Sequence, residues 1–331
     1  MAPLTRCRAD EGRVPNELML TYYVQRSGAG LIFTEATSVS ARGVGYPDTP
    51  GIWNEAQMEG WKKIVSAVHA AGGRIALQLW HVGRISDPVY LDGLLPVAPS
   101  AIAPEGHVSL VRPEKPFVTP HALTTEEIAA TIDDYRNAAR LSKQAGFDGV
   151  LIHAANGYLI DQFLQSSSNH RDDEYGGNIA ARCRFLNEVV EAVAESWDPG
   201  LIGVHLAPRC DTHGMGDEDP RALFTHVALE MKARGVGYLS AREHHEQPAL
   251  GPAIKEVFGG PFVANEKFTR ETAIRAVESG DADAVAFGRD YIANPDLPER
   301  LFRDSSLNEP DPSTFYGGGS EGYTDYPELE D

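Results

Sequence analysis

Short apolar runs alternate with longer stretches of helical periodicity along this chain. The runs that are apolar almost throughout, and therefore predict buried strands, are Gly30–Ala36, Arg74–Trp80, Gly149–His153, Leu201–Ala207, Gly237–Ala241, Pro261–Ala264 and Ala284–Gly288. Amphipathic patterns that predict helices lie between most of them, for example over Asn54–Ala71, Thr125–Ala145, Asn178–Ser196 and Pro220–Arg234. Continuous apolar strands flanked by helices are typical of a parallel sheet that is covered on its faces.

With Met1–Leu4 counted as a further strand, the pattern predicts an α/β fold of eight β/α units, a (β/α)8 TIM barrel that takes up residues 1–331 as a single domain. A doubly wound sheet is the alternative, but no GxGxxG follows the first strand. Two regions interrupt the alternation. Val82–His121 is rich in proline and glycine and predicts a long excursion after the third strand that caps the barrel mouth. Asn308–Asp331 predicts either an ordered wrap or a partly mobile end.

Composition and charge narrow the range of partners. The chain is 42% hydrophobic and 23% charged, which allows a large core, and its net charge of −19 disfavours nucleic acid and anionic membranes. No apolar run approaches the roughly 20 residues that span a membrane, and the N-terminus lacks the apolar segment of a secretory signal. Cys7, Cys183 and Cys210 are scattered and odd in number, as expected in a reducing cytosol. We therefore expect a cytoplasmic monomer or homodimer that acts on small molecules.

The most informative stretch is Phe147–Leu164, with the sequence FDGVLIHAANGYLIDQFL. Its apolar run ends at His153, and Asn156 and Tyr158 follow closely. In a TIM barrel the active site lies at the C-terminal ends of the strands. His153 and Asn156 can both donate hydrogen bonds to one oxygen, while Tyr158 can supply a proton. Two donors and an acid suit addition to a conjugated double bond.

The segment HAANGYLIDQFL also resembles the substrate-binding signature of the Old Yellow Enzyme flavoproteins. Further motifs of that family are spread over nearly the whole chain: MAPLTR, TEAT, LQLWHVGR, QSSSNHRDDEYGG, AVAFGRDYIANPDLPERL and FYGGGSEGYTDYP. The resemblance implies an FMN-dependent ene reductase, in which hydride passes from NAD(P)H through flavin N5 to the activated C=C bonds of enones, maleimides and nitroalkenes. The phrases VHLAPRCDTHGMGD, ANEKF and LSAREHHE look most like the bacterial xenobiotic reductase and N-ethylmaleimide reductase branch, which adds nitrate esters to the expected substrates.

The resemblance assigns roles to individual residues. It implies FMN contacts for Pro3, Leu4, Thr5, Ala36, Gln78, His205, Lys267, Gly288 and Arg289. Among them, Thr5 would bond flavin O4, while Gly288 and Arg289 would hold the phosphate; backbone N–H groups at a helix start beside an arginine also favour an anion on physical grounds. It implies substrate contacts for His153, Asn156, Trp80 and Tyr316, with Tyr158 as the catalytic proton donor.

Three features depart from the family pattern. His205 stands where many members have an arginine beside flavin N1 and O2, and His121 replaces the arginine of a TPRAL motif. Relatives usually carry a further strand and a short hairpin before MAPLTR, which predicts a truncated first strand. A relative with weak or lost FMN binding and little activity is therefore an alternative, and a flavin-free lyase or hydrolase that uses His153 is another.

The run Glu243, His244, His245 and Glu246 raises the question of a metal site. Adjacent histidines in a loop rarely converge on one ion, and no clear third ligand accompanies them, so we expect no metal.

Overall fold

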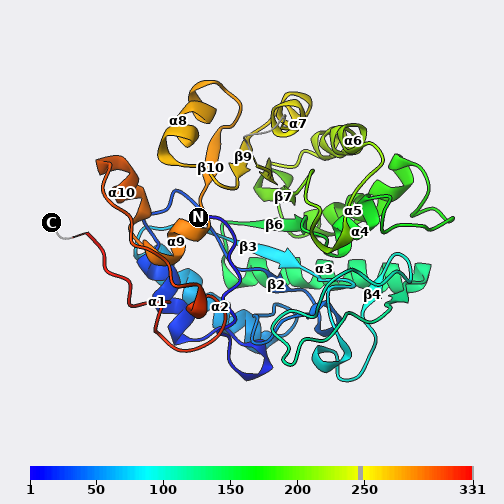
Figure 1. Cartoon of the computed structure of the whole chain (residues 1–331), viewed down its shortest axis with the longest axis horizontal. Coiled ribbons are helices and arrows are strands. Elements are labelled where there is room, and N and C mark those ends of the chain that lie inside the picture. Colours follow the sequence, from blue (N-terminus) through cyan, green and yellow to red (C-terminus); the bar gives the residue numbers. More distant parts are fainter. Residues whose placement is uncertain (245–248, 330–331) are drawn as a thin grey trace.

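A parallel sheet curls through the middle of the molecule in the computed structural model, which describes residues 1–244 and 249–329 (Figure 1). Its strands follow the order β1-β3-β6-β7-β8-β9-β10, and β2 pairs with β3. These strands are β1 (Ile32–Phe33), β2 (Thr37–Ser38), β3 (Ile75–Trp80), β6 (Gly149–Ala154), β7 (Ile202–Leu206), β8 (Tyr238–Arg242), β9 (Phe262–Asn265) and β10 (Ala284–Ala286). Each of the seven apolar runs between Gly30 and Gly288 that were predicted as strands overlaps one of them. The fold is the predicted (β/α)8 TIM barrel.

The start of the chain lies between the two outermost strands of this sheet. The N–H of Phe33, in β1, donates to the carbonyl of Met1 at 3.1 Å, and the N–H of Ala2 donates to the carbonyl of Phe287, just after β10, at 2.8 Å. The segment thus bridges β1 and β10, but no strand forms over Met1–Leu4, so that this part of the prediction is wrong. The reason is local: Pro3 has no N–H group and cannot extend a ladder.

Helices cover the outside of the curled sheet (Figure 1). They are α1 (Glu17–Gln25), α2 (Glu55–Ala70), α3 (Thr125–Ala145), α4 (Leu159–Leu164), α5 (Ile179–Ala194), α6 (Pro220–Ala233), α7 (Gly251–Phe258), α8 (Arg270–Glu278), α9 (Arg289–Ala293) and α10 (Leu297–Arg303). The four predicted helices are α2, α3, α5 and α6. Helix α3 begins at a capping box between Thr124 and Glu127 and ends at Gly146, whose φ of 89° suits glycine.

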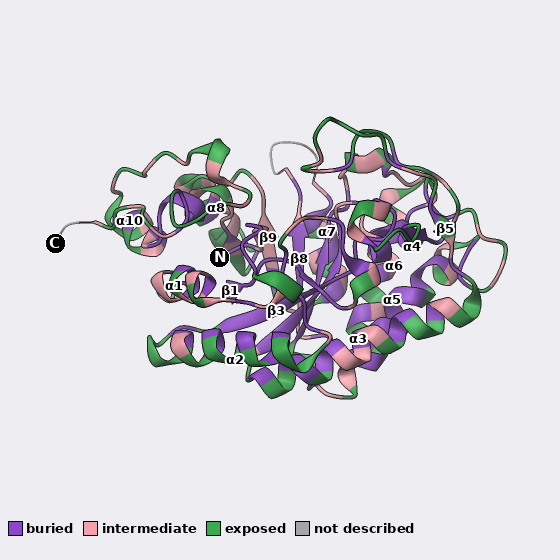
Figure 2. Ribbon diagram, turned by 90° about the horizontal axis from the view of Figure 1, so that it is seen from below, coloured by how far each residue is buried: buried purple, intermediate pink, exposed green. Residues whose placement is uncertain are grey.

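The burial of residues agrees with this arrangement of strands and helices. Figure 2 shows β3 buried along its length, whereas α2 and α3 alternate buried and exposed residues. The strands therefore form the core together with the inner faces of the helices, as expected for a parallel sheet that is covered on both sides. Within the parts of the chain that the structure describes, no helix is both long and apolar enough to cross a membrane.

The excursion at Val82–His121 lies over the ends of the strands. It contributes β4 (Val97–Ala98), which pairs in parallel with β5 (His121–Ala122). Val108 and Phe117 of this excursion pack in one apolar cluster with Ala36 and Trp80. Because Trp80 ends β3, this packing places the excursion at the barrel mouth, as predicted.

The C-terminal tail wraps against the start of the chain. Tyr323 is fully buried and stacks on Tyr22 of α1, with ring centroids 4.2 Å apart. The Arg6 guanidinium donates to the carbonyls of Phe315 and Gly322, each at 2.9 Å. Of the two alternatives for the tail, the ordered wrap is correct as far as residue 329.

Candidate active site

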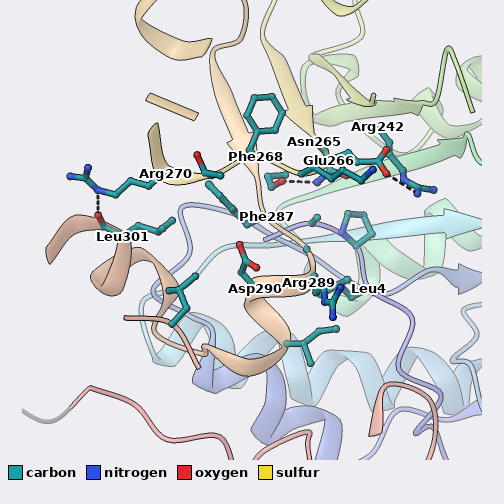
Figure 3. Close-up of a pocket in the computed structure, with 18 of the residues that line it drawn as sticks. Leu4, Arg242, Asn265, Glu266, Phe268, Arg270, Phe287, Arg289, Asp290 and Leu301 are labelled. Atoms are coloured by element: carbon teal, nitrogen blue, oxygen red, sulfur yellow. Dashed lines mark hydrogen bonds and ion pairs between the residues drawn. The ribbon is translucent and has the colours of Figure 1, made fainter. Parts of the chain in front are cut away.

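A cavity of about 820 Å³ opens at the C-terminal ends of β7 to β10. Its volume lies in the range of roughly 300–1,000 Å³ that is usual for small-molecule and cofactor sites. The start of the chain, the loops after β9 and β10 and the C-terminal tail form its walls (Figure 3). The predicted site residues that line it are Pro3, Leu4, Thr5, Asn156, His205, Lys267, Gly288, Arg289 and Tyr316.

His153 and His205 lie next to each other because their strands are paired in register. The two residues are direct partners across β6 and β7, and their ring centroids are 5.2 Å apart. Both side chains are buried. Nδ1 of His153 has no hydrogen-bond partner within the described residues. A buried polar atom without a partner is destabilising by about 1–3 kcal/mol, so this nitrogen fits a site that a ligand completes.

The turn after β6 brings Asn156 and Tyr158 to the same place. Asn156 has a left-handed backbone with φ 59°, and Gly157 follows with φ 77°. This tight turn sets the Tyr158 ring perpendicular to the His153 ring, at an interplanar angle of 87° with centroids 5.1 Å apart. The structure therefore brings together the three residues that were predicted from one short stretch of sequence.

Tyr158 is held by other aromatic residues. Its hydroxyl lies 2.9 Å from the hydroxyl of Tyr46, and its ring meets that of Trp80 edge to face at 5.1 Å. Burial, with the neighbouring Tyr46, raises the pKa of Tyr158 well above its usual value. Tyr158 therefore keeps its proton at neutral pH, as a proton donor must.

Both histidines at the site are uncharged. Burial lowers the pKa of His153 well below its usual range, and His205 and Arg242 lower it further. Burial and Arg242 lower the pKa of His205 to about 3. A neutral imidazole carries one N–H, so each ring can still donate one hydrogen bond.

Like His153 and Tyr158, three more of the predicted residues do not line the cavity. Gln78 is buried and its Nε2 lies 3.2 Å from Nδ1 of His205, so it supports a residue that does line the cavity. Ala36 and Trp80 are buried in the apolar cluster next to Tyr158. None of the three is among the lining residues.

Cationic and apolar groups also line the cavity. Arg289, Lys267 and Gly288 line it together with Leu4, and Figure 3 shows Arg289 beside Leu4. Lys267 has a φ of 56°, which is uncommon for a residue with a side chain and typical of functional sites. Two cations beside the first turn of α9 suit a phosphate group.

Two further residues complete the site and were not predicted. Arg242, the last residue of β8, lines the cavity. The strand was predicted to end at Ala241, and a strand longer by one residue would have included Arg242. Tyr46, the partner of Tyr158, lies in an irregular loop in which no periodic signal marks it.

Glu243, one of the four residues that raised the question of a metal, has another role. The Glu243 carboxylate accepts from the N–H groups of Leu250 and Gly251 and pairs with Arg209. His245 and Glu246 lie outside the described residues. In residues 1–244 and 249–329, no group of three or more His, Cys, Asp or Glu side chains could hold a metal ion.

His121, which departs from the family pattern, lies away from the cavity. Its Nε2 is 2.7 Å from the Glu127 carboxylate, and it thereby links β5 to the first turn of α3.

Comparison with known proteins agrees with this geometry. Residues 1–308 match the NADH:flavin oxidoreductase / NADH oxidase family. The chain is 44% identical to a "Probable flavin mononucleotide-dependent alkene reductase" of Leishmania infantum, over 99% of this chain and 92% of that protein. It is 42% identical to 12-oxophytodienoate reductase 2 of Arabidopsis thaliana, over 100% and 91%.

Solved structures give the same result. Morphinone reductase in complex with tetrahydroNAD superposes with a TM-score of 0.96 at 48% identity, over 100% of this chain and 93% of that chain. The Old Yellow Enzyme homologue from Zymomonas mobilis superposes with a TM-score of 0.96 at 45% identity, over 99% and 95%.

The chain belongs to the NADH:flavin oxidoreductase / NADH oxidase family, the Old Yellow Enzyme proteins. It is therefore an oxidoreductase, with FMN as its cofactor and NAD(P)H as its co-substrate. The site fits this cofactor, because cations suited to a phosphate line the cavity and the unpartnered nitrogen of His153 belongs to a ring that lies against His205, which also lines it.

Proposed function

We propose that this enzyme is an ene reductase that uses NAD(P)H to reduce activated C=C bonds. The observation that carries the proposal is the group formed by two neutral donors, His153 and Asn156, beside the protonated Tyr158. Enones, maleimides and nitroalkenes all carry an oxygen conjugated to the reacting double bond, so all can use this group. Nitrate esters share the oxygen but not the double bond, and we include them because of the sequence resemblance alone.

Bound FMN would supply the redox chemistry, as the carrier of hydride between the reduced nicotinamide and the substrate. Pro3, Leu4, Thr5 and His205 would lie against its ring system. Gly288, Arg289 and Lys267 would hold its phosphate through backbone N–H groups and positive charge. Ala36 and Gln78 would act from behind this wall, Gln78 through its contact with His205.

The side chains of the site would polarise the substrate. An imidazole N–H of His153 and an amide N–H of Asn156 donate to the carbonyl or nitro oxygen, which draws electron density away from the β-carbon. Such donors stabilise the negative charge that develops on the oxygen in the transition state. Because both are uncharged, they leave the oxygen unprotonated and direct the proton to carbon.

Tyr158 would deliver that proton to the α-carbon. Its raised pKa keeps the proton available at neutral pH, and the hydroxyl of Tyr46 fixes its position. Trp80 packs against the Tyr158 ring from inside the barrel, and Tyr316, which is 52% exposed, stands at the solvent side where a substrate would enter.

We infer that residues 1–331 act as one FMN-binding domain, as a monomer or homodimer in the cytoplasm, without nucleic acid or membrane partners. A relative that has lost FMN is not favoured. The cations suited to a phosphate, Arg289 and Lys267, are present, and so are the two donors, His153 and Asn156. A flavin-free lyase or hydrolase does not agree with the family.

Anaerobic titration tests the proposed function. The purified protein is expected to absorb at about 450 nm, as bound flavins do. NADPH or NADH should bleach this band, and an enone such as 2-cyclohexenone should restore it with formation of the saturated ketone. A protein that NAD(P)H bleaches, but that neither an enone, a maleimide nor a nitroalkene reoxidises, would contradict the proposal.

A further inference from the structure

We propose that Arg242 is a positioning residue that fixes the side chain of Asn156 so that its amide N–H group faces the substrate oxygen. This inference rests on the proposed function, because it assigns the orientation of one of the two donors in that site. It concerns a residue to which the resemblance to the family assigned no role.

The contact itself is direct. Nη1 of Arg242 lies 3.0 Å from Oδ1 of Asn156, and both residues line the cavity. A guanidinium has five donors and no acceptor, so the amide atom that faces it must be the oxygen. The NH₂ group of Asn156 is thereby turned away from Arg242. No described residue accepts a hydrogen bond from this NH₂ group, which leaves it for a ligand.

Arg242 is itself held in place from the other side. Its Nη2 pairs with the Glu266 carboxylate at 3.1 Å, and Figure 3 shows this pair across the loop after β9. Glu266 has a φ of 102°, an uncommon backbone conformation for a residue with a side chain. Glu266, Arg242 and Asn156 thus form a chain of hydrogen bonds that begins in the loop after β9 and ends at the donor.

The backbone of Asn156 has a separate support. Its carbonyl lies 3.1 Å from Nδ1 of His213, and its left-handed φ is set by the turn before Tyr158. These contacts fix where the side chain begins, but they do not fix which end of the amide points at the substrate. An amide is nearly symmetrical in shape, so without a charged donor on one side both orientations are open to it. The flipped orientation presents an acceptor to the substrate oxygen, and two acceptors repel.

Arg242 also affects the protonation of the two histidines at the site. Its positive charge adds to burial in lowering the pKa of both His153 and His205. Both imidazoles therefore remain neutral beside the donor that Arg242 orients.

The test is a double-mutant cycle read by phenol binding. A phenol places an oxygen between the same two donors without turnover, and its affinity is followed by a long-wavelength charge-transfer band in FMN-saturated protein. Arg242→Met keeps the length of the side chain and removes its donors. We expect Arg242→Met to weaken binding of 4-chlorophenol by about 10-fold, the equivalent of one typical net hydrogen bond. In an Asn156→Ala background the same change should have an effect below about 2-fold, since neighbouring residues that act through one another are not additive.

Two controls separate positioning from a general effect of charge or folding. Arg270 lines the same cavity and is similarly exposed, but its guanidinium contacts the Leu301 carbonyl and Asp304 instead. Arg270→Met should leave the affinity for 4-chlorophenol within about 2-fold of the wild type. Arg242→Lys keeps a cationic donor and should recover part of the loss. FMN content and melting temperature, measured for every variant, identify any that fails to fold.

The outcomes are distinct. An equal effect of Arg242→Met with and without Asn156, or an unchanged affinity in Arg242→Met and Arg242→Lys alike, overturns the role of Arg242 and leaves the proposed function standing. A wild-type protein that holds FMN but gives no phenol complex overturns the proposed donor site, and the positioning role with it.

Discussion

Single side chains at the site owe their chemistry to where the fold buries them. His153 in water would be partly charged near neutral pH, but burial keeps it neutral, and Tyr158 keeps its proton for the same reason. Asn156 needs no particular pKa, but it does need an orientation. In the proposed mechanism, burial and two partners, Tyr46 and Arg242, thus make two donors and an acid of three ordinary residues.

We predict that His153→Ala weakens binding of phenols and enones alike. The loss of a hydrogen bond to a partly charged oxygen corresponds to about 1.5–3 kcal/mol, or roughly a 10- to 150-fold higher Kd. Titration of the charge-transfer band gives the Kd, and His69→Ala, on the outer surface beside Asp148, is the control. An unchanged affinity in His153→Ala would remove this residue from the binding pocket.

At the scale of elements, the fold converts distance in sequence into proximity. Parallel strands end at one rim, so residues from β6, β7, β8 and β10 meet there although well over a hundred positions separate the first from the last. The C-terminal tail contributes a further residue to this rim. Arg6 and Arg8, from the start of the chain, donate to backbone carbonyls of the tail and thereby hold Tyr316 at the cavity.

We predict that Tyr323→Ala releases this tail. Its ring is fully buried, stacks on Tyr22 and lies under the Arg8 guanidinium at 4.2 Å. Truncation of a large buried aromatic residue is expected to lower the free energy of unfolding by about 3–5 kcal/mol. Urea denaturation measures the change, and Tyr326→Ala, which removes a partly exposed ring from the same tail, should lower it by less than half as much. Equal losses in both variants would contradict the anchoring role of Tyr323.

The strands and the larger helices could be predicted because each has its own periodic signal. The boundaries of α3 agree with the pattern residue by residue, since a capping box and a glycine mark its ends. Met1–Leu4 was predicted wrongly because apolar character does not reveal whether a ladder can form past Pro3. His153 could be found from the end of its strand, whereas Tyr46 could not, because its role depends on a loop that no local pattern places.

The molecule as a whole carries a large negative charge and also contains buried carboxyl groups. Glu35 lies in the core beside Tyr23 and the backbone of Arg6, and burial raises its pKa from 4.5 to about 7. Asp161 is buried in α4, and its pKa is raised to about 7 as well. In the unfolded chain these groups lose their protons at lower pH than in the folded protein.

We predict that Glu35 makes the protein less stable as the pH rises from about 4.5 to about 7. Over this window the unfolded state binds fewer protons than the folded state, so the free energy of unfolding falls, by about 3 kcal/mol for a shift of this size. Glu35→Gln replaces the titrating carboxyl group by a neutral amide and thereby removes this pH-dependent contribution to the free energy of unfolding. Melting temperatures of the two proteins should diverge in favour of the variant between pH 5 and pH 8. A difference that stays constant over that range would show that Glu35 does not titrate as described.

The most direct test of the account as a whole is the separation of the two half-reactions in Tyr158→Phe. Stopped-flow absorbance at about 450 nm follows the bleaching by NADPH and, in a second experiment, the recovery with 2-cyclohexenone. Only the recovery needs a proton on carbon, and a general acid contributes about 100-fold or more to such a step. The account predicts bleaching at the wild-type rate and recovery slowed by at least about 100-fold. Equal slowing of both half-reactions, or an unchanged recovery, would contradict it.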